Sequence, residues 1–335
     1  MIDWSMVLEW VIKSLIIILG MTGGFAYVTL YERKVLARLQ VRVGPNRTGP
    51  WGILQPVADG IKLIFKEELT PAYADKPIFI LAPVVTVVPA LVITAVVPWG
   101  TSINLFGREI PLYLSNINVA VLYILSVTSI SVYGITLAGW SSNNKYAMLG
   151  GLRSTAQMIS YELALGLAYV GPMMLAGSMS LMDIAESQRQ LPFAILQPVA
   201  FIIYFLASTA EINRAPFDMP EAEQELTAGY HTEYSSMKFA MFFMAEYIKM
   251  IAVSMIGATL FLGGFQGPFV DQLPWLGPIY LFLKVAAWLF VLIWFRATLP
   301  RFRYDRLMAL GWKVLFPVAL LNVVVTAVIL LAVGG

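Results

Sequence analysis

The chain has no cysteine and only one histidine, His231, among its 335 residues. Without cysteine it can form no disulfide, no cysteine-ligated zinc site and no iron–sulfur cluster of its own, and it has no thiol for catalysis. A single histidine also excludes a metal or haem site built from several histidines. The sequence therefore predicts a protein that binds no metal or redox cofactor itself.

Charged residues are also scarce. They make up 13% of the chain and hydrophobic residues 59%, whereas about a quarter of a soluble domain is charged. The net charge of +2 is too small to suggest nucleic acid as a partner. No phosphate loop, dinucleotide fingerprint or nucleophile elbow is present. The composition indicates a membrane protein with several spans and no large soluble domain.

Eight apolar segments have the length that a bilayer span requires. Because lipid offers no partner to backbone N–H and C=O groups, we expect each segment to be a helix. The sequence thus predicts an all-α integral membrane protein with a single polytopic domain over residues 1–335. The first segment is too long for the apolar part of a signal peptide, so we expect it to be retained. The expected spans are 8–31, 77–99, 116–139, 154–177, 192–211, 237–263, 275–297 and 310–333.

Prolines inside the expected spans predict kinks or breaks in the helices. They are Pro83, Pro89, Pro172, Pro198 and Pro317.

Positive charge is concentrated on one side of this expected topology. Seventeen of the 22 lysines and arginines lie in four alternate connections, residues 31–76, 139–153, 212–238 and 296–313. The positive-inside rule places these connections in the cytoplasm or the equivalent organelle compartment. Because the number of spans is even, both termini are expected on the outer side.

The first of these connections contains a pattern typical of an amphipathic helix at about residues 52–67. Its apolar residues and its polar residues follow helical spacing on two different faces. Such a helix is expected to lie in the membrane interface, and a plain surface anchor remains open as its whole role. The apolar set is Leu54, Val57, Ala58, Ile61 and Phe65, and the polar set is Gln55, Asp59, Lys62 and Lys66.

Glu162, Glu246 and Lys249 are ionisable residues inside the expected spans. Such a residue is costly in a bilayer unless it is paired or hydrated, which favours a functional role. Lys249 follows Glu246 by three positions on one helix face, so it is a candidate partner. The alternative interpretation is an internal ion pair that only fixes helix packing.

The connection 211–236 is rich in acidic residues that lie close together. Carboxyl groups crowded in this way raise one another's pKa, so that some can hold and pass protons near neutral pH. A solvated acidic loop is the alternative, but Phe217, Leu226, Tyr230 and Tyr234 favour a packed loop. His231 alone indicates a structural residue rather than a site.

Basic residues gather between residues 33 and 47. A lipid-headgroup patch and a docking surface for a soluble partner both fit them, and the sequence does not separate the two. They are Arg33, Lys34, Arg38, Arg42 and Arg47.

Several blocks of sequence resemble the H subunit of bacterial proton-pumping NADH:quinone oxidoreductase, respiratory complex I, whose mitochondrial counterpart is the first NADH dehydrogenase subunit. The resemblance extends from the first expected span to the last and is carried by multi-residue blocks in the same order. The blocks are Tyr31-Glu32-Arg33-Lys34, residues 42–50 (RVGPNRTGP), 54–63 (LQPVADGIKL), 211–218 (EINRAPFD), 229–235 (GYHTEYS) and 296–305 (RATLPRFRYD).

This resemblance implies a fold of eight spans plus the interfacial helix, and a subunit that anchors the peripheral arm, lines the access tunnel of the quinone substrate and couples quinone reduction to proton translocation. The implied tunnel residues are Arg33, Arg42, Arg47, Asp59, Lys62, Phe217 and Tyr230. The implied proton-transfer residues are Glu162, Glu211, Glu221, Glu223, Glu225, Glu233 and Glu246.

The resemblance also implies the surroundings of the chain. FMN and the iron–sulfur clusters are expected on partner subunits, and no cofactor on this chain. Its expected partners are the quinone-site and terminal iron–sulfur subunits of the peripheral arm, adjacent membrane-arm subunits and lipids, with no nucleic acid. The expected location is the bacterial inner membrane or its mitochondrial or plastid equivalent.

Two other functions fit parts of the pattern. The first is the homologous anchor subunit of a membrane-bound hydrogenase or ferredoxin-driven ion-pumping complex, which needs no quinone, although the 229–235 block favours the quinone enzymes. The second is a stand-alone secondary transporter that uses buried carboxylates. The absence of an evident internal repeat and the large one-sided loops argue against this second alternative.

Overall fold

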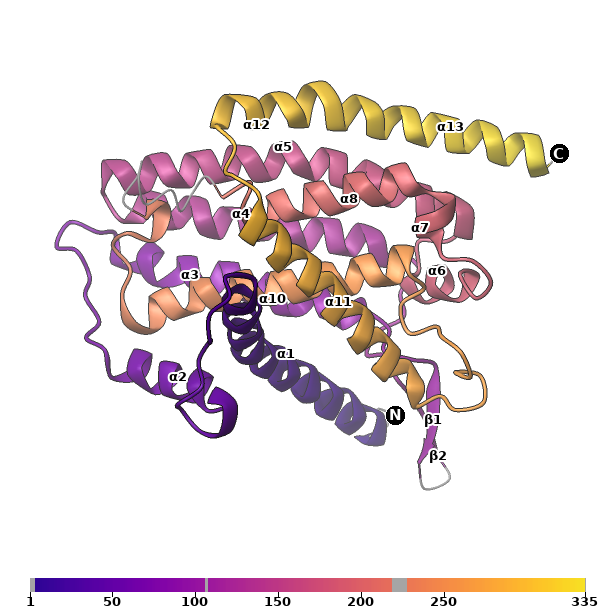
Figure 1. The fold of residues 1–335 in the computed structure, drawn as a ribbon, viewed down its shortest axis with the longest axis horizontal. Coiled ribbons are helices and arrows are strands. Elements are labelled where there is room, and N and C mark those ends of the chain that lie inside the picture. The colour runs from indigo at the N-terminus through magenta and orange to yellow at the C-terminus, as the bar shows by residue number, and fades with distance from the viewer. Residues whose placement is uncertain (1–3, 106–107, 219–227, 335) are drawn as a thin grey trace.

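The computed structural model describes residues 4–105, 108–218 and 228–334. Helices dominate this part of the chain, as Figure 1 shows. The α-helices are α1 (Trp4–Leu39), α2 (Gln55–Phe65), α3 (Lys76–Val92), α4 (Ala120–Ser141), α5 (Lys145–Ala176), α6 (Leu181–Ser187), α7 (Phe193–Leu196), α8 (Pro198–Glu211), α10 (Ser236–Phe261), α11 (Leu276–Thr298), α12 (Tyr304–Leu310) and α13 (Phe316–Gly334). Shorter turns of helix are η1 (Pro50–Gly52), η2 (Ile93–Val96), η3 (Gly229–His231) and the π-helical η4 (Gly311–Leu315).

Seven helical segments of the described chain are long and apolar enough to cross a membrane. The prediction of an all-α membrane protein is therefore confirmed. The number of crossings, their exact limits and the single domain stay predictions. The seven segments are Met6–Leu39, Lys76–Val96, Ala120–Ser141, Lys145–Ala176, Ser236–Phe261, Leu276–Thr298 and Tyr304–Val333.

The segment expected as a span at 192–211 is not one continuous helix. It divides into α7 and α8, which are separated at Gln197. Pro198 explains the break, because proline has no N–H to donate and forces the preceding residue out of helical geometry. With 14 residues, α8 is roughly 21 Å long and so shorter than the ~30 Å hydrocarbon core of a bilayer.

The first helix is longer than expected. We expected a span at 8–31 followed by a loop, but α1 continues to Leu39. No glycine or proline occurs between Phe25 and Val43, and the residues around Arg33 and Arg38 have good helix propensity. Three basic residues assigned to a loop, Arg33, Lys34 and Arg38, therefore project from a helix. The interfacial helix α2 lies within the expected range 52–67, and it has no buried residue.

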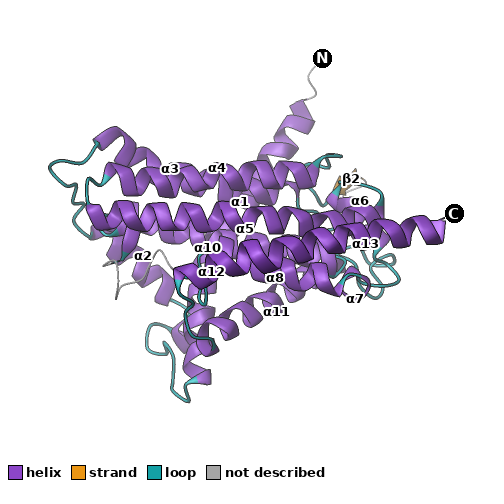
Figure 2. Cartoon of the chain, turned by 90° about the horizontal axis from the view of Figure 1, so that it is seen from above, coloured by secondary structure: helices purple, strands orange, loops and turns teal. Residues whose placement is uncertain are grey.

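The long helices form a bundle around α10. Helices α3, α4 and α5 run side by side in Figure 2, and α13 lies along α5. Helix α10 packs against α1, α3 and α11, and every residue from Tyr247 to Phe261 is buried. The two chain ends lie toward the same end of the bundle, and α2 lies toward the opposite end (Figure 1).

Close packing at the centre of the bundle depends on Gly257 of α10. A Cβ atom at this position would lie 2.6 Å from the Tyr204 ring and 2.9 Å from the Trp288 ring. Because real Cβ atoms do not approach other atoms this closely, α10 can lie against α8 and α11 only with glycine here.

A short hairpin connects α3 to α4 and was not predicted. Strand β1 (Ser102–Leu105) pairs antiparallel with β2 (Arg108–Pro111), with Ser102 opposite Pro111. Only four residues long, each strand is too short to give a clear alternating pattern against the apolar background.

Candidate quinone-access cavity and buried charge network

A cavity of about 420 Å³ lies between α1, α2 and α10. Its volume falls in the range typical of sites for small organic molecules. Most of its wall is apolar, with phenylalanine and methionine side chains contributed by α1 and α10. The lining residues are Phe25, Ala26, Thr29, Arg33, Pro56, Asp59, Gly60, Lys62, Leu63, Ile64, Met237, Phe239, Ala240, Met241, Phe243, Met244 and Tyr247.

Three of the tunnel residues implied by the resemblance meet at the polar edge of this cavity. Arg33 Nη1 of α1 lies 2.7 Å from Asp59 Oδ2 of α2, and Lys62 Nζ lies 3.6 Å from the other oxygen, Oδ1. Partial burial raises the pKa of Asp59, but the Arg33 guanidinium outweighs this effect and holds the pKa below its ordinary value. The edge of the cavity therefore carries an ionised carboxylate between two cations.

Tyr247 connects the cavity to a group of buried charges. Its side chain lines the cavity, and the Arg214 guanidinium carbon lies 4.4 Å from the centre of its ring. This is the geometry of a cation–π contact, which is strengthened when the cation is withdrawn from water. One aromatic ring thus separates the apolar cavity from a buried arginine.

Arg214 is the centre of a network that joins four elements. Its Nε lies 2.5 Å from Glu246 Oε1 of α10, and its Nη1 lies 3.4 Å from Glu32 Oε1 of α1. Glu32 also forms an ion pair with Arg296 of α11. Burial lowers the pKa of Arg214, but the carboxylates of Glu246 and Glu32 outweigh this and raise it well above its ordinary value. Arg214 is therefore a permanently charged group inside the protein.

Glu246 also faces a second, much smaller cavity of about 20 Å³. Glu211, Lys249 and Tyr230 contribute to its wall, and a volume of ~15 Å³ with several polar partners is enough for one water molecule. Lys249 Nζ donates a hydrogen bond to Ser131 Oγ of α4 at 2.6 Å. The candidate partner of Glu246 was Lys249, but the cation paired with Glu246 in the structure is Arg214.

Glu162 lies on α5, where it accepts a hydrogen bond from Ser129 of α4. The partly buried side chain therefore has a polar partner inside an apolar stretch of the bundle. Its neighbour Tyr161 is fully buried, and its hydroxyl donates to the Leu307 carbonyl at 2.9 Å.

The remaining implied residues lie in other places. Asn144 Nδ2 donates to Glu233 Oε1 at 2.6 Å. Phe217 is packed in the core against Tyr161 and Phe302. Arg47 is exposed. Glu221, Glu223 and Glu225 lie outside the described residues.

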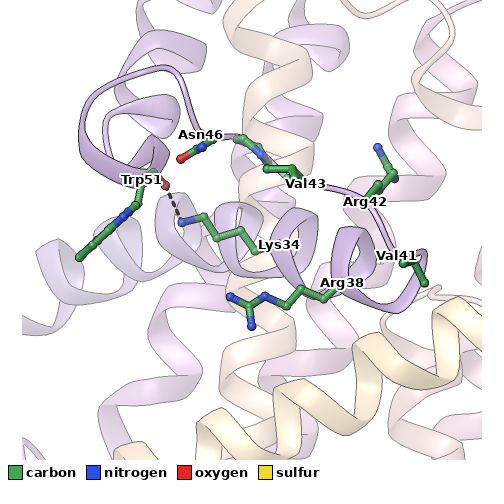
Figure 3. A pocket seen from close by; sticks show the side chains of 9 residues that line it. Lys34, Arg38, Val41, Arg42, Val43, Asn46 and Trp51 are labelled. Carbon is green, nitrogen blue, oxygen red and sulfur yellow. Dashed lines mark hydrogen bonds between the residues drawn. The ribbon is translucent and has the colours of Figure 1, made fainter.

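Arg42 lines a different cavity, of about 700 Å³, formed by the end of α1 and the segment 41–51. Figure 3 shows Arg42 with Lys34 and Arg38 around it, and Lys34 Nζ donating to the Trp51 carbonyl at 2.5 Å. No acidic residue contributes to its lining. Three of the five residues of the expected basic cluster, Lys34, Arg38 and Arg42, therefore surround a concave surface.

Three members of the network were not candidates from the sequence: Glu32, Arg214 and Arg296. Glu32 fell one residue beyond the expected end of the first span, Arg296 fell at the end of another, and Arg214 fell in the connection 211–236. A charge in the last turns of a long apolar helix is common to Glu32 and Arg296, but exposed Arg33 shares it, so this signal alone does not mark a buried charge.

Known proteins match this chain over nearly its whole length. A family model described as NADH dehydrogenase matches residues 12–327. The chain belongs to this NADH dehydrogenase family. The H subunit of NADH-quinone oxidoreductase from Thermomicrobium roseum is 52% identical over 337 positions, which cover 98% of this chain and 97% of that protein. An H subunit from Syntrophobacter fumaroxidans is 49% identical over the full length of both, and one from Geobacter metallireducens is 52% identical over 95% of this chain and 94% of that protein.

Membership of the NADH dehydrogenase family confirms the resemblance inferred from the sequence. The chain is thus a membrane subunit of an enzyme complex, NADH-quinone oxidoreductase. In the described residues no group of three or more histidine, aspartate or glutamate side chains is arranged to hold a metal ion.

Proposed function

We propose that this chain provides the quinone-access cavity of the complex and starts the path by which quinone reduction is coupled to proton translocation. The observation that carries the proposal is the position of Tyr247. It forms part of the apolar cavity on one side and contacts Arg214 of the charge network on the other.

The cavity has the chemistry that a quinone requires. A long isoprenoid tail favours apolar walls, which phenylalanine and methionine side chains of α1 and α10 supply. The interfacial position expected for α2 places the cavity at the level where a lipid-soluble substrate leaves the bilayer. Electrons reach the quinone from iron–sulfur clusters on partner subunits, because this chain has no cysteine with which to hold a cluster.

The buried carboxyl groups provide candidate proton carriers. A change of charge on a quinone near Tyr247 acts on Arg214, and through it on Glu246 at 2.5 Å. Such interactions are strong because little water screens them. Glu246 and Glu211 share the small cavity with Lys249, so one water molecule would connect the two carboxyl groups. Glu162 on α5 is the next acidic group of the proposed path.

We also propose the topology expected from the sequence, with both termini on the outer side of the bacterial inner membrane. The location of both chain ends at one end of the bundle supports it. On the opposite side, the exposed basic residues of α1 and the 41–51 segment would face the peripheral-arm subunits. The relatives described above are all subunits of NADH-quinone oxidoreductases, which favours this function over the hydrogenase and transporter alternatives.

The test is a set of isosteric substitutions in the assembled complex. Glu246→Gln and Glu211→Gln remove a proton-carrying group while keeping its size. In membrane vesicles, we expect NADH-driven proton translocation to fall at least tenfold, together with or more than quinone reduction. Glu109→Gln, in the exposed hairpin, is the matched control. Normal pumping and normal quinone reduction in both buried variants would refute the proton-path role.

A further inference from the structure

Helix α2 forms one wall of the access cavity without burying any residue. Its position therefore depends on polar contacts at its two sides. We call the contacts with the start of α10 the α10 clasp, and those with the end of α1 the α1 latch. The two sets differ in number and in chemistry.

The α10 clasp is dense and partly shielded. It consists of three neutral hydrogen bonds and one ion pair between residues 63–69 and residues 235–238. Ser236 Oγ donates to Leu63 O at 3.0 Å, Ser235 Oγ donates to Glu67 O at 3.0 Å and accepts from Leu69 N at 3.1 Å, and Lys238 Nζ lies 2.5 Å from Glu68 Oε1. The Lys238 side chain is 14% exposed and that of Glu68 51%, and Lys238 lies 5.1 Å from the centre of the Phe79 ring. These contacts fix the last turn of α2 and the residues that follow it.

The α1 latch consists of two adjacent cations on flexible side chains. Arg33 pairs with Asp59 at 2.7 Å, and Lys34 donates to the Trp51 carbonyl at 2.5 Å. The Arg33 side chain is 50% exposed and that of Asp59 25%. Exposed pairs of this kind contribute little, because water and salt screen them and long side chains lose entropy when they are held. With two contacts against the four of the clasp, the latch is therefore the weaker of the two attachments.

The segment before α2 is folded closely onto the helix. Gly52 lies in the left-handed region with φ of 74°, and a Cβ atom there would lie 2.3 Å from the Pro45 carbonyl oxygen. Thr48 also donates to Gln55 at 2.8 Å. The Lys34 side chain joins this turn to α1, and Gly44, directly before the turn, lies against the α1 backbone at Arg33 and Lys34.

From this asymmetry we propose that α2 turns about the α10 clasp, and that release of Arg33 and Lys34 widens the access cavity on its α1 side. Arg33 and Lys34 are then positioning residues for substrate access: they set the fraction of time in which the gap between α1 and α2 admits a long apolar tail. This inference rests on the proposed function for its substrate, a long-tailed quinone, but the movement itself does not.

The movement is tested by distance measurements in the purified complex in lipid nanodiscs. Spin labels carried by non-canonical amino acids replace Tyr27 of α1 and Val57 of α2, which are both exposed. A second pair replaces Phe65, at the end of α2, and Leu81 of α3, also exposed. In the Arg33→Gln/Lys34→Gln variant we expect the first distance to lengthen and broaden while the second is unchanged. An unchanged first distance, or equal lengthening of both, overturns the hinge.

Enzyme kinetics then test whether the movement of α2 controls the access of quinone to the cavity. With a long-tailed quinone, the double variant should show a KM lower by about two- to fivefold, the range that the free energy of exposed ion pairs allows, and a kcat that changes less than the KM. The KM for a short-tailed quinone should fall less than the KM for the long-tailed one. The reversed pair Arg33→Asp/Asp59→Arg should restore part of the original KM. The Lys13→Gln/Arg189→Gln variant, which also removes two cations, both of them paired with carboxylates away from α2, is the control.

The two failures are distinguishable. If the first distance lengthens but the KM for long-tailed quinone does not change, α2 does turn about the clasp and the cavity is not the quinone route. If the distance does not change, the hinge is wrong whatever the kinetics show.

Discussion

Two arginine–carboxylate pairs in this protein have nearly the same contact distance and opposite surroundings. Arg33 and Asp59, at 2.7 Å, are 50% and 25% exposed. Arg214 and Glu246, at 2.5 Å, are 9% and 12% exposed. The first pair joins a surface helix to its neighbour, and the second lies inside the bundle. The same chemistry therefore provides a releasable contact in one region and a fixed charge in the other, because water determines the cost of separating the charges.

The strongest test of this comparison is Arg214→Met. The substitution leaves the carboxylates of Glu32 and Glu246 in an apolar environment without their shared cation. Breaking a buried pair from one side typically costs about 3–5 kcal/mol, so we expect loss of thermal stability of the complex and loss of assembled subunit on native gels. Arg214→Lys, which keeps the charge but not the planar fork, should give a smaller loss.

Removal of Arg33 tests the exposed pair in the same way as Arg214→Met tests the buried pair. Arg33→Met should leave assembly and thermal stability close to those of the original protein. If Arg33→Met and Arg214→Met destabilise the complex equally, burial is not what distinguishes the two pairs.

Loss of a buried neutral hydrogen-bonding group should lower the stability of the complex by less than Arg214→Met and by more than Arg33→Met. Gln157 is fully buried on α5, and its Nε2 donates to the carbonyls of Ala210 at 2.8 Å and Phe217 at 2.7 Å. In Gln157→Leu, both carbonyls lose this donor, at a cost of about 2–4 kcal/mol. We expect a lower midpoint of thermal unfolding, measured on the purified complex, and a shift in the loop that carries Arg214.

The exposed Gln190→Leu is the control for this substitution. A Gln157→Leu complex as stable as this control would show that α5 does not position the loop through Gln157.

The sequence was sufficient to predict most helices and the depth of several charges, because apolar length and an isolated glutamate are local signals. The pattern around Glu246 indicated a buried carboxyl group but not its partner. Glu32 and Arg214 are 182 positions apart, and their meeting depends on the packing of α1, α10 and α11. Pro198 did predict the break before α8, whereas no local signal separates the exposed side of α1 from the side that carries Glu32.

The smallest expected effects concern the Arg33–Asp59 pair and its response to salt and pH. Because both side chains are partly exposed, salt should weaken the pair: the screening length is about 10 Å at 0.1 M and about 3 Å at 1 M. Raising KCl from about 0.1 to about 1 M should therefore lengthen the Tyr27–Val57 distance, as the Arg33→Gln/Lys34→Gln substitution does. Thermal stability should hardly change, since the Arg214 network is shielded from solvent.

Acid should have little effect over most of the accessible range. Partial burial raises the pKa of Asp59, but the opposing effect of Arg33 is larger. The pKa of Asp59 is therefore below its ordinary value of 3.8. A carboxyl group with a lowered pKa in the folded protein contributes stability above its unfolded pKa and loses it only as pH falls through the folded pKa. The Tyr27–Val57 distance should thus stay constant from about pH 8 to about pH 5 and lengthen only below about pH 4. Lengthening between pH 8 and 5 would mean that a group other than Asp59 holds α2 against α1, and would remove the contrast between the two arginine pairs.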